Sequence, residues 1–242
     1  MTRRRTAAGG GTAVEVPAER LVGWINRFGA RNGGLAELST DGEVLRVRGG
    51  DGTLATIEVP FGPMVVDRRE SGPPDPGRDE PDAPGGAGAA RLEPVEALLD
   101  HLRGLGPLGL ILVRGGAHSV GVAVGGVVTR SSTDRAYLQG RTAAGGWSQQ
   151  RFARRRGNQR AASLADAADT VARVLLPETL AGLVLGGDRA SLADVLADPR
   201  LVRLAALTAR TFADVPEPRR AVLDEVAVRS LSVPIVVEPP IP

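Results

Sequence analysis

A stretch rich in proline and glycine divides the hydrophobic sequence of this chain into two parts. Residues 71 to 90 (SGPPDPGRDEPDAPGGAGAA) hold five prolines and five glycines, and none of their apolar side chains is larger than alanine or proline. Such a segment cannot bury enough apolar surface to offset the conformational entropy that it would lose on folding. We therefore expect a flexible linker or loop at residues 66 to 90, with the cores built from the sequence on either side.

The N-terminal side predicts a short leader followed by a small α+β section at residues 18 to 65. Residues 1 to 17 are rich in glycine, threonine and arginine and are expected to be disordered. From residue 18 the apolar side chains recur three and four positions apart, which predicts a helix that ends near Asn32. Three short runs separated by Asp-Gly pairs then predict an antiparallel meander. These runs are residues 35 to 39, 43 to 48 and 54 to 59.

The C-terminal side, residues 91 to 242, predicts a mixed β-sheet flanked by helices, so the fold class is α+β. Predicted strands are residues 108 to 113, 118 to 124, 126 to 131, 135 to 139 and 181 to 185. Predicted helices are a segment after Leu92, a long helix from the Gly145-Gly146 pair to about Leu176, a helix capped by Ser191 with Asp194, and residues 199 to 212 and 217 to 230, before a proline-rich tail.

Charge is distributed unevenly along the chain. The formal net charge is only +2, and every basic side chain is arginine, whose planar guanidinium suits contact with phosphate. Between Arg130 and Arg160, however, eight arginines are accompanied by one acidic residue, Asp134, so that segment carries +7 and the remainder −5. A solvated helix face normally mixes charges of both signs. The separation therefore favours a surface that binds a polyanion.

The basic segment combines a loop of small residues with an arginine-rich helix, in the sequence GRTAAGGWSQQRFARRRGNQR at residues 140 to 160. Small residues up to Gly146 give the loop a thin backbone that can enter a narrow space. Behind the loop, Arg151, Arg154 and Arg155 recur three and four positions apart and share one helix face. Because a helix N-terminus also attracts anions, this arrangement favours phosphate.

Neutral polar residues stand between the loop and the arginine-rich helix. Ser148, Gln149 and Gln150 cannot act as strong bases. A carboxamide can orient a water molecule, or donate a hydrogen bond to a developing oxyanion, without itself ionising. Chemistry at this position must therefore depend on how the groups are placed.

The residues GGWSQQRFARRRGNQ resemble the catalytic loop and following helix in the middle domain of eukaryotic and archaeal class I translation release factors. In those proteins Gly-Gly-Gln precedes a similar Arg-Phe-Ala-Arg helix, and residues 181 to 187 (AGLVLGG) resemble the strand that follows. The segment is most similar to the Vms-type (ANKZF-type) peptidyl-tRNA hydrolases, in particular their bacterial, actinobacterial-like branch. The Gly-x-x-Gln motif of that branch falls on Gly146 to Gln149, and the resemblance covers about residues 91 to 230.

The resemblance implies a ribonuclease H-like catalytic domain that frees nascent chains from tRNA on stalled ribosomes. It implies Gln149 as the catalytic glutamine and Gly146 as its backbone partner, with Gln150 as the second candidate because Trp147 interrupts the Gly-Gly-Gln spacing. The implied partners are the large ribosomal subunit and peptidyl-tRNA. The residues expected to contact RNA are Arg141, Trp147, Arg151, Arg154, Arg155, Arg156 and Arg160.

Two other classes of function fit the same segment. In a noncatalytic module that binds ribosomal RNA, the arginines would dock on RNA and the glutamine would have no chemical part. In a nuclease, the target would be a phosphodiester in the tRNA acceptor end and not the peptidyl ester.

Composition excludes several other kinds of site. With no cysteine and only His101 and His118, a structural zinc site is not expected, and no metal or cofactor is predicted. No apolar run reaches the roughly 18 residues of a membrane span, and the basic first residues lack the apolar core of a secretory signal. A cytoplasmic protein with no membrane contact is therefore expected.

Three smaller motifs are interpreted as structural. His118 and Ser119 are adjacent in a predicted strand and so point to opposite faces, which argues against a base and nucleophile pair. Asp166 and Asp169 are assigned to a solvated helix face. The Gly186-Gly187-Asp188 sequence lacks a phosphate-loop pattern and is interpreted as a turn from strand to helix.

Overall fold

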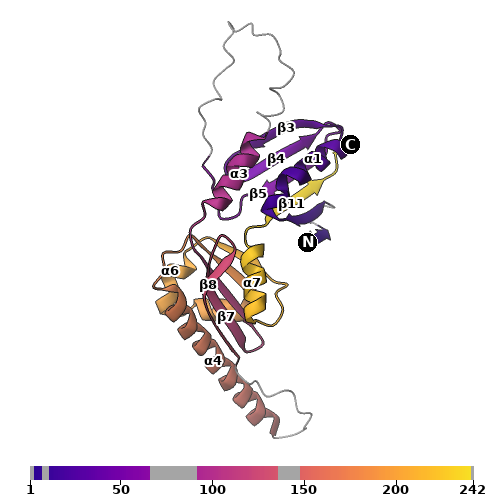
Figure 1. The fold of residues 1–242 in the computed structure, drawn as a ribbon. Coiled ribbons are helices and arrows are strands. Elements are labelled where there is room, and N and C mark those ends of the chain that lie inside the picture. The colour runs from indigo at the N-terminus through magenta and orange to yellow at the C-terminus, as the bar shows by residue number, and fades with distance from the viewer. Residues whose placement is uncertain (1–2, 7–10, 66–91, 136–147, 241–242) are drawn as a thin grey trace, which may run out of the picture. The chain divides into compact units, whose positions relative to one another are not determined.

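The computed structural model describes residues 3–6, 11–65, 92–135 and 148–240, with the backbone path alone for residues 3–6 and 148–156 (Figure 1). The chain forms two compact units, each with its own sheet. The first takes its described residues from Met1–Gly104 and Leu231–Pro242, and the second from Leu105–Ser230. The boundary differs from the one expected at residue 91, because the helix after Leu92 and the C-terminal segment both belong to the first unit.

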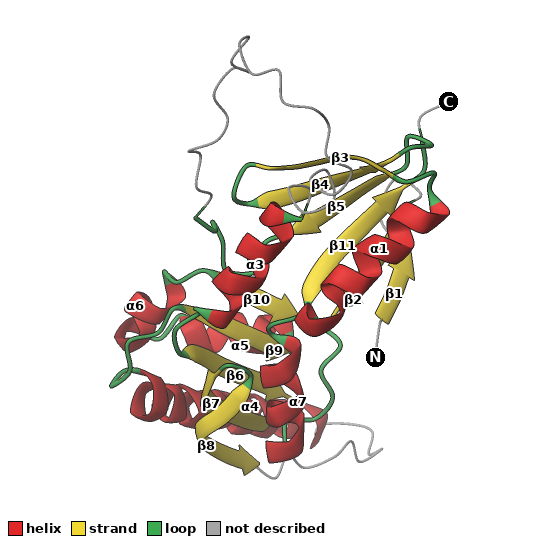
Figure 2. Ribbon diagram, turned by 45° about the horizontal axis from the view of Figure 1, so that its top comes forward, coloured by secondary structure: helices red, strands yellow, loops and turns green. Residues whose placement is uncertain are grey.

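The first unit contains a six-stranded antiparallel sheet with the strand order β1-β2-β11-β5-β4-β3 (Figure 2). The predicted meander is confirmed as β3, β4 and β5. The strands of this sheet are β1 (Arg3–Thr6), β2 (Thr12–Val16), β3 (Leu35–Thr40), β4 (Val44–Gly49), β5 (Leu54–Glu58) and β11 (Val233–Glu238).

Two helices lie across the same face of this sheet, as Figures 1 and 2 show. They are α1 (Leu21–Arg31), which follows the short 3-10 helix η1 (Ala18–Arg20), and α3 (Glu93–Arg103). A sheet that is covered by helices on one face should have buried and exposed side chains in alternation along each strand. Strand β4 has this pattern, since Leu45 and Val47 are buried while Arg46 and Arg48 are exposed. The helix predicted from residue 18 to Asn32 is confirmed.

The predictions for the two ends of the chain were wrong, because both ends contain strands. Residues 12–16, which were expected to lie in a disordered leader, form β2, and residues 3–6 form β1. The proline-rich tail contains β11, whose Val233 is registered with Val16 of β2. Val14 and Val16 alternate with more exposed neighbours and are buried by this pairing. A strand whose partner lies more than 200 residues away carries no local signal of its structure.

The second unit contains a five-stranded mixed sheet with the strand order β10-β9-β6-β7-β8. Strands β6, β7 and β8 form an antiparallel meander, and β9 and β10 continue the sheet in parallel with β6. This arrangement is the mixed sheet expected of a ribonuclease H-like domain. The strands are β6 (Leu108–Arg114), β7 (Ala117–Val124), β8 (Val127–Arg135), β9 (Gly182–Gly187) and β10 (Ala209–Phe212).

Helices cover both faces of this sheet. On one face α4 (Ser148–Leu175) and α5 (Arg189–Leu196) bury a core that includes Ile111 and Val120. On the other face, α7 (Arg220–Arg229) brings Leu223 so close to Gly121 that an added Cβ would lie 2.9 Å from the leucine side chain. The prediction of a mixed sheet flanked by helices is therefore confirmed, including the long helix that ends at Leu175.

Three local predictions in the second unit were wrong. The helix expected at residues 199 to 212 is a 3-10 turn, η3 (Pro199–Leu201), and a short helix, α6 (Val202–Ala205), followed by strand β10. Strand β10 forms because its parallel pairing with β9 buries Phe212. Helix α5 was expected to be capped by Ser191, but its N-cap is Asp188. The Asp188 side chain accepts a hydrogen bond from the Ser191 amide. Two strands were expected, at residues 126 to 131 and 135 to 139. The structure has one strand, β8, at Val127–Arg135, and residues 136–139 lie outside the described residues.

The turn after β9 depends on Gly187, as the Gly186-Gly187-Asp188 sequence predicted. Gly187 has a φ of +109°, and a Cβ added there would lie 2.2 Å from the carbonyl oxygen of Val113. Both the backbone angle and the space therefore require glycine. Gly157 lies in α4 with nothing within 4 Å of an added Cβ, so it provides a matched control.

We expect Gly187→Ala to lower the free energy of unfolding by about 2 kcal/mol or more, because backbone strain adds to the clash with Val113. Gly157→Ala should leave the free energy unchanged or raise it by up to about 1 kcal/mol, since alanine is the better helix former. Urea unfolding followed by circular dichroism measures both. A Gly187→Ala protein as stable as the wild type would contradict the assigned turn.

Candidate functional site

The segment with the predicted site residues leads into α4. Strand β8 ends at Arg135 and α4 begins at Ser148, and the sequence between them lies outside the described residues. Three predicted residues fall in that gap, namely Gly146, Arg141 and Trp147. The others before Arg160 occupy the first turns of α4, where the structure gives the backbone path: Gln149, Gln150, Arg151, Arg154, Arg155 and Arg156.

Helix α4 is anchored to the sheet by its C-terminal half. Its described side chains become buried only from Ser163 onward, and the inward positions Ala167 and Val171 join the core. Figure 1 shows the N-terminal half of the helix extending beyond the sheet. At a rise of 1.5 Å per residue, residues 148–162 form a rod about 22 Å long. The predicted glutamine and arginine positions lie on this rod, which we call the projecting helix.

Because α4 is one continuous helix, the helical period relates the projecting positions to the anchored ones. Residues 149, 153, 156 and 160 continue, at steps of three and four, the stripe of Leu164, Ala167 and Val171 that packs on the sheet. Arg151, Arg154 and Arg155 fall instead on the side shared with Asn158, Ala162, Asp166 and Asp169, all of which are exposed. The three arginine positions therefore lie on the face of α4 opposite to its packed stripe.

Arg160 is the one predicted RNA-contact residue whose side chain the structure describes. Its Nη2 lies 3.3 Å from Ser191 Oγ, 3.6 Å from Asp194 Oδ2 and 3.9 Å from Asp188 Oδ2. The hydrogen bonds from Ser191, with a smaller contribution from Arg160, hold the pKa of Asp188 below its ordinary value of 3.8. Arg160 thus contacts two carboxylates of its own unit.

Two further arginines of the basic segment contact acidic residues that lie far away in the sequence. Arg130 lies 3.2 Å from Glu178, and Arg135 lies 3.2 Å from Glu217. Sequence reasoning missed these carboxylates because none of them lies between Arg130 and Arg160. The excess of positive charge along the segment is thus partly compensated in space, and it is compensated at its two ends.

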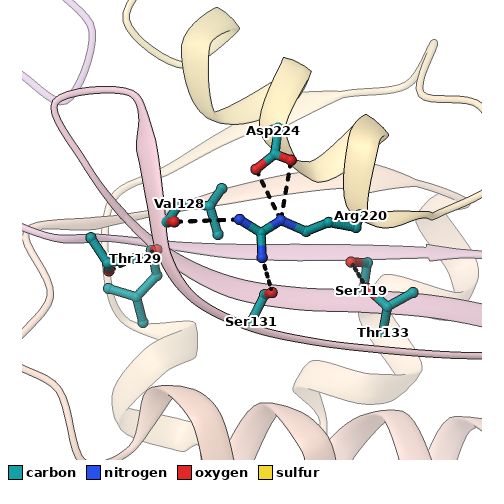
Figure 3. Close-up of polar contacts among 8 residues, drawn as sticks. Ser119, Val128, Thr129, Ser131, Thr133, Arg220 and Asp224 are labelled. Carbon is teal, nitrogen blue, oxygen red and sulfur yellow. Dashed lines mark hydrogen bonds and ion pairs between the residues drawn. The ribbon is translucent and has the colours of Figure 1, made fainter.

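A second cluster of polar contacts fixes strand β8 (Figure 3). Arg220 of α7 donates from Nη1 to Ser131 Oγ at 2.9 Å and from Nε to the Asp224 carboxylate at 3.0 Å. The hydroxyl group of Thr133 on the same strand lies 2.6 Å from the hydroxyl group of Ser119 on β7. These contacts tie α7 and β7 to β8, the last described strand before α4.

His118 lies in the interface between β7 and α4, as a structural role predicts. Its Nε2 lies 3.2 Å from Thr170 Oγ1 and 4.0 Å from Asp166 Oδ2, and its side chain is only 2% exposed. Burial lowers the pKa of His118 below its ordinary value of 6.5, against the opposing influence of Asp166. Because Ser119 bonds to Thr133, the pair does not form a nucleophile and base.

Among the residues that the structure describes, no three His, Asp or Glu side chains are grouped so that they could hold a metal ion. Asp169 is bound at 2.7 Å by Arg200. None of the described helices is long and apolar enough to cross a membrane.

The buried His118 predicts a pH dependence of stability. Below pH 6.5 the unfolded chain binds a proton at this histidine that the folded chain does not bind until its lower pKa is reached. The free energy of unfolding should therefore fall as the pH decreases from 6.5 toward that pKa. Urea titrations between pH 5 and pH 8 should show a smaller fall for His118→Gln, with His101→Gln as the matched control. An identical slope in wild type and His118→Gln would contradict this assignment.

The comparison with known families agrees with the geometry of the second unit. The model of the Actinobacteria/chloroflexi VLRF1 release factor family matches residues 106–236, which is more than half of the chain and nearly the whole of the second unit. A search of curated proteins found no match. The resemblance to release factors seen in the GGWSQQRFARRRGNQ segment is thereby confirmed at the level of the family. The chain belongs to the Actinobacteria/chloroflexi VLRF1 release factor family.

Proposed function

We propose that this protein is a peptidyl-tRNA hydrolase that releases nascent chains from stalled ribosomes in the cytoplasm. Membership of a release factor family supports a role in translation. The observation that carries the finer proposal is the projecting helix, whose first turn contains the glutamine of the Gly-x-x-Gln motif and which extends beyond the sheet. A rod anchored at one end can deliver its other end into a confined cavity such as the peptidyl transferase centre.

The arginine positions on the projecting helix support an RNA partner. Arg151, Arg154 and Arg155 lie close to the N-terminus of α4. Cations are unfavourable there because the helix dipole has its positive end at the N-terminus. No acidic residue occurs in the first turn to offset them. Phosphates of ribosomal RNA or tRNA would neutralise this charge, and the three positions lie on the face of α4 that does not pack against the protein. Arg141, Trp147 and Arg156 are proposed as further RNA contacts.

In the proposed reaction, the loop ending at Gly146 brings the Gln149 carboxamide close to the ester that joins the peptide to the terminal ribose of tRNA. The carboxamide orients a water molecule, whose oxygen attacks the ester carbonyl carbon. The bond to the ribose oxygen then breaks, the ribose hydroxyl regains a proton, and the peptide leaves as a carboxylic acid. Backbone amides and groups of the ribosome stabilise the oxyanion, so the protein itself requires no strong base.

The Gly-x-x-Gln motif, which falls on Gly146 to Gln149, favours Gln149 over Gln150 as the catalytic glutamine. The helical period places residue 149 in line with the stripe through Arg160, whereas residue 150 falls about 100° away around the helix. The two positions therefore lie on different sides of the helix axis and are not equivalent. This difference makes Gln150 a matched control.

We expect Gln149→Ala to lower the rate of peptide release by about a hundredfold to a thousandfold, the usual cost of losing one positioned catalytic donor. Gln150→Ala should have a much smaller effect. The assay uses purified ribosomes carrying labelled peptidyl-tRNA and measures the free peptide over time. Release by Gln149→Ala at the wild-type rate would overturn the assignment.

The same reaction mixture separates the proposal from a nuclease. Ester hydrolysis leaves the tRNA acceptor end intact, so mapping the 3′ end of the RNA after reaction should return the full-length terminus. A shortened terminus would show phosphodiester cleavage. A protein that binds ribosomes fully and releases no peptide would be the noncatalytic module.

We expect the affinity for ribosomes to fall as the salt concentration rises. The arginines on the outer face of the projecting helix should determine the slope of log affinity against log salt. Each phosphate contact contributes a slope of about −0.7 to −0.9 in log affinity against log salt. Replacing Arg151, Arg154 and Arg155 with glutamine should therefore make the slope shallower by about 2. Replacing Arg219, an exposed residue at the N-cap of α7, should leave the slope unchanged. An equal slope for the triple variant and the wild type would contradict the RNA contacts.

A further inference from the structure

The projecting helix leaves the second unit at a defined point, which we call the root. Ser163 is the first buried side chain of α4, and its Oγ donates a hydrogen bond to the carbonyl oxygen of Gly116 at 3.1 Å. One turn earlier lies Arg160, which is exposed and faces the N-terminal part of α5. From Arg160 toward Ser148, the direction of the rod depends on contacts made at this root.

The contacts of Arg160 link α4 to α5 and to the residue that joins α5 to β9. Asp188 is the N-cap of α5 and directly follows Gly187 at the end of β9. Ser191 donates both its backbone amide and its hydroxyl to Asp188, which fixes the carboxylate. Asp194 lies one turn further along α5 and approaches Arg160 to 3.6 Å. The Arg160 guanidinium therefore contacts two carboxylates and a hydroxyl group, all of which belong to α5 and its N-cap.

These contacts compete with the role in RNA binding that the sequence suggested for Arg160. A guanidinium between two carboxylates is already compensated, so it offers a phosphate little net positive charge. Arg160 also lies in line with the packed stripe of α4 and not on the face of Arg151, Arg154 and Arg155. Its position favours an interaction with the protein's own α5.

We propose that Arg160 is a positioning residue, which sets the direction of the projecting helix through Asp188, the N-cap of α5, and Asp194, on the following turn of α5. The inference rests on the proposed function for its consequence, since the direction of the rod decides where Gln149 lies. A small displacement of a reacting group lowers the rate of the chemical step more than it lowers affinity. Loss of the root contacts should therefore reduce kcat for release while ribosome affinity changes little.

The chain contains no cysteine, so spin labels can be attached at chosen positions without removing a native residue. Asn158 and Val127 are exposed, and cysteines there report the distance between the projecting helix and the sheet. Pulsed electron paramagnetic resonance on the free protein should give a broader or shifted distance distribution for Arg160→Gln than for the wild type. Arg203→Gln, on α6, is the matched control and should leave the distribution unchanged.

Charge exchange tests the partner directly. The double variant Arg160→Asp with Asp194→Arg restores an ion pair in the opposite sense and should recover the wild-type distance distribution, whereas each single variant should not. In the release assay, Arg160→Gln should lower kcat by about tenfold or more, with the affinity and its salt slope unchanged. A thermal melt shows that each variant is folded.

Two results would overturn the proposal. The first is an unchanged distance distribution in Arg160→Gln, and the second is a salt slope shallower by about 0.7 to 0.9 with kcat unchanged, which would make Arg160 a phosphate contact. The distance measurement uses the free protein and does not depend on activity. If the wild type releases no peptide, the proposed function fails while the inference about Arg160 is still tested.

Discussion

The packing of the C-terminal half of α4 on the five-stranded sheet is the interaction on which the rest of the second unit depends. Ala167 and Val171 contribute to a core that includes Ile111 and Val120, and this core holds one end of a 28-residue helix. A helix of about 15 residues is marginally stable in water when nothing supports it. Continuity with the packed half supplies that support, so the projecting residues can carry a sequence chosen for chemistry and not for packing.

The arrangement of charge in the second unit also differs between the packed part and the projecting half of α4. At the anchored part of the unit, arginines are matched by carboxylates from distant segments, as Arg130 is by Glu178 and Arg160 is by Asp194. The arginines that the sequence places nearest to Gln149 have no acidic neighbour in the first turn of α4. Compensated charges leave little net charge for an external ligand, whereas an excess of positive charge at a helix N-terminus favours binding to an external polyanion. For a member of a release factor family, that polyanion is proposed to be RNA.

Local sequence was sufficient for elements whose apolar pattern is strong and whose neighbours are close. The helix before Asn32, the N-terminal meander, the strands at Leu108 and Ala117, the long helix and the strand at Gly182 were all predicted within a few residues. Two strands that the sequence did not predict, β2 and β10, pair with segments that are distant in the sequence. Strand β10 is held by β9, and β2 is held by β11 at the opposite end of the chain. Neither segment has enough apolar residues to indicate a strand by itself.

The sequence by itself determined the motif, the excess of arginine after it and the family, because these depend on residue types in a fixed order. It also determined the length of α4, since the helical spacing of Leu164, Ala168 and Val171 is a local property. Only the tertiary structure decided which arginines are compensated and which face of α4 is packed. Arg160 meets Asp188 and Asp194 because β9 and α5 fold back beside α4, and no local pattern records such a contact.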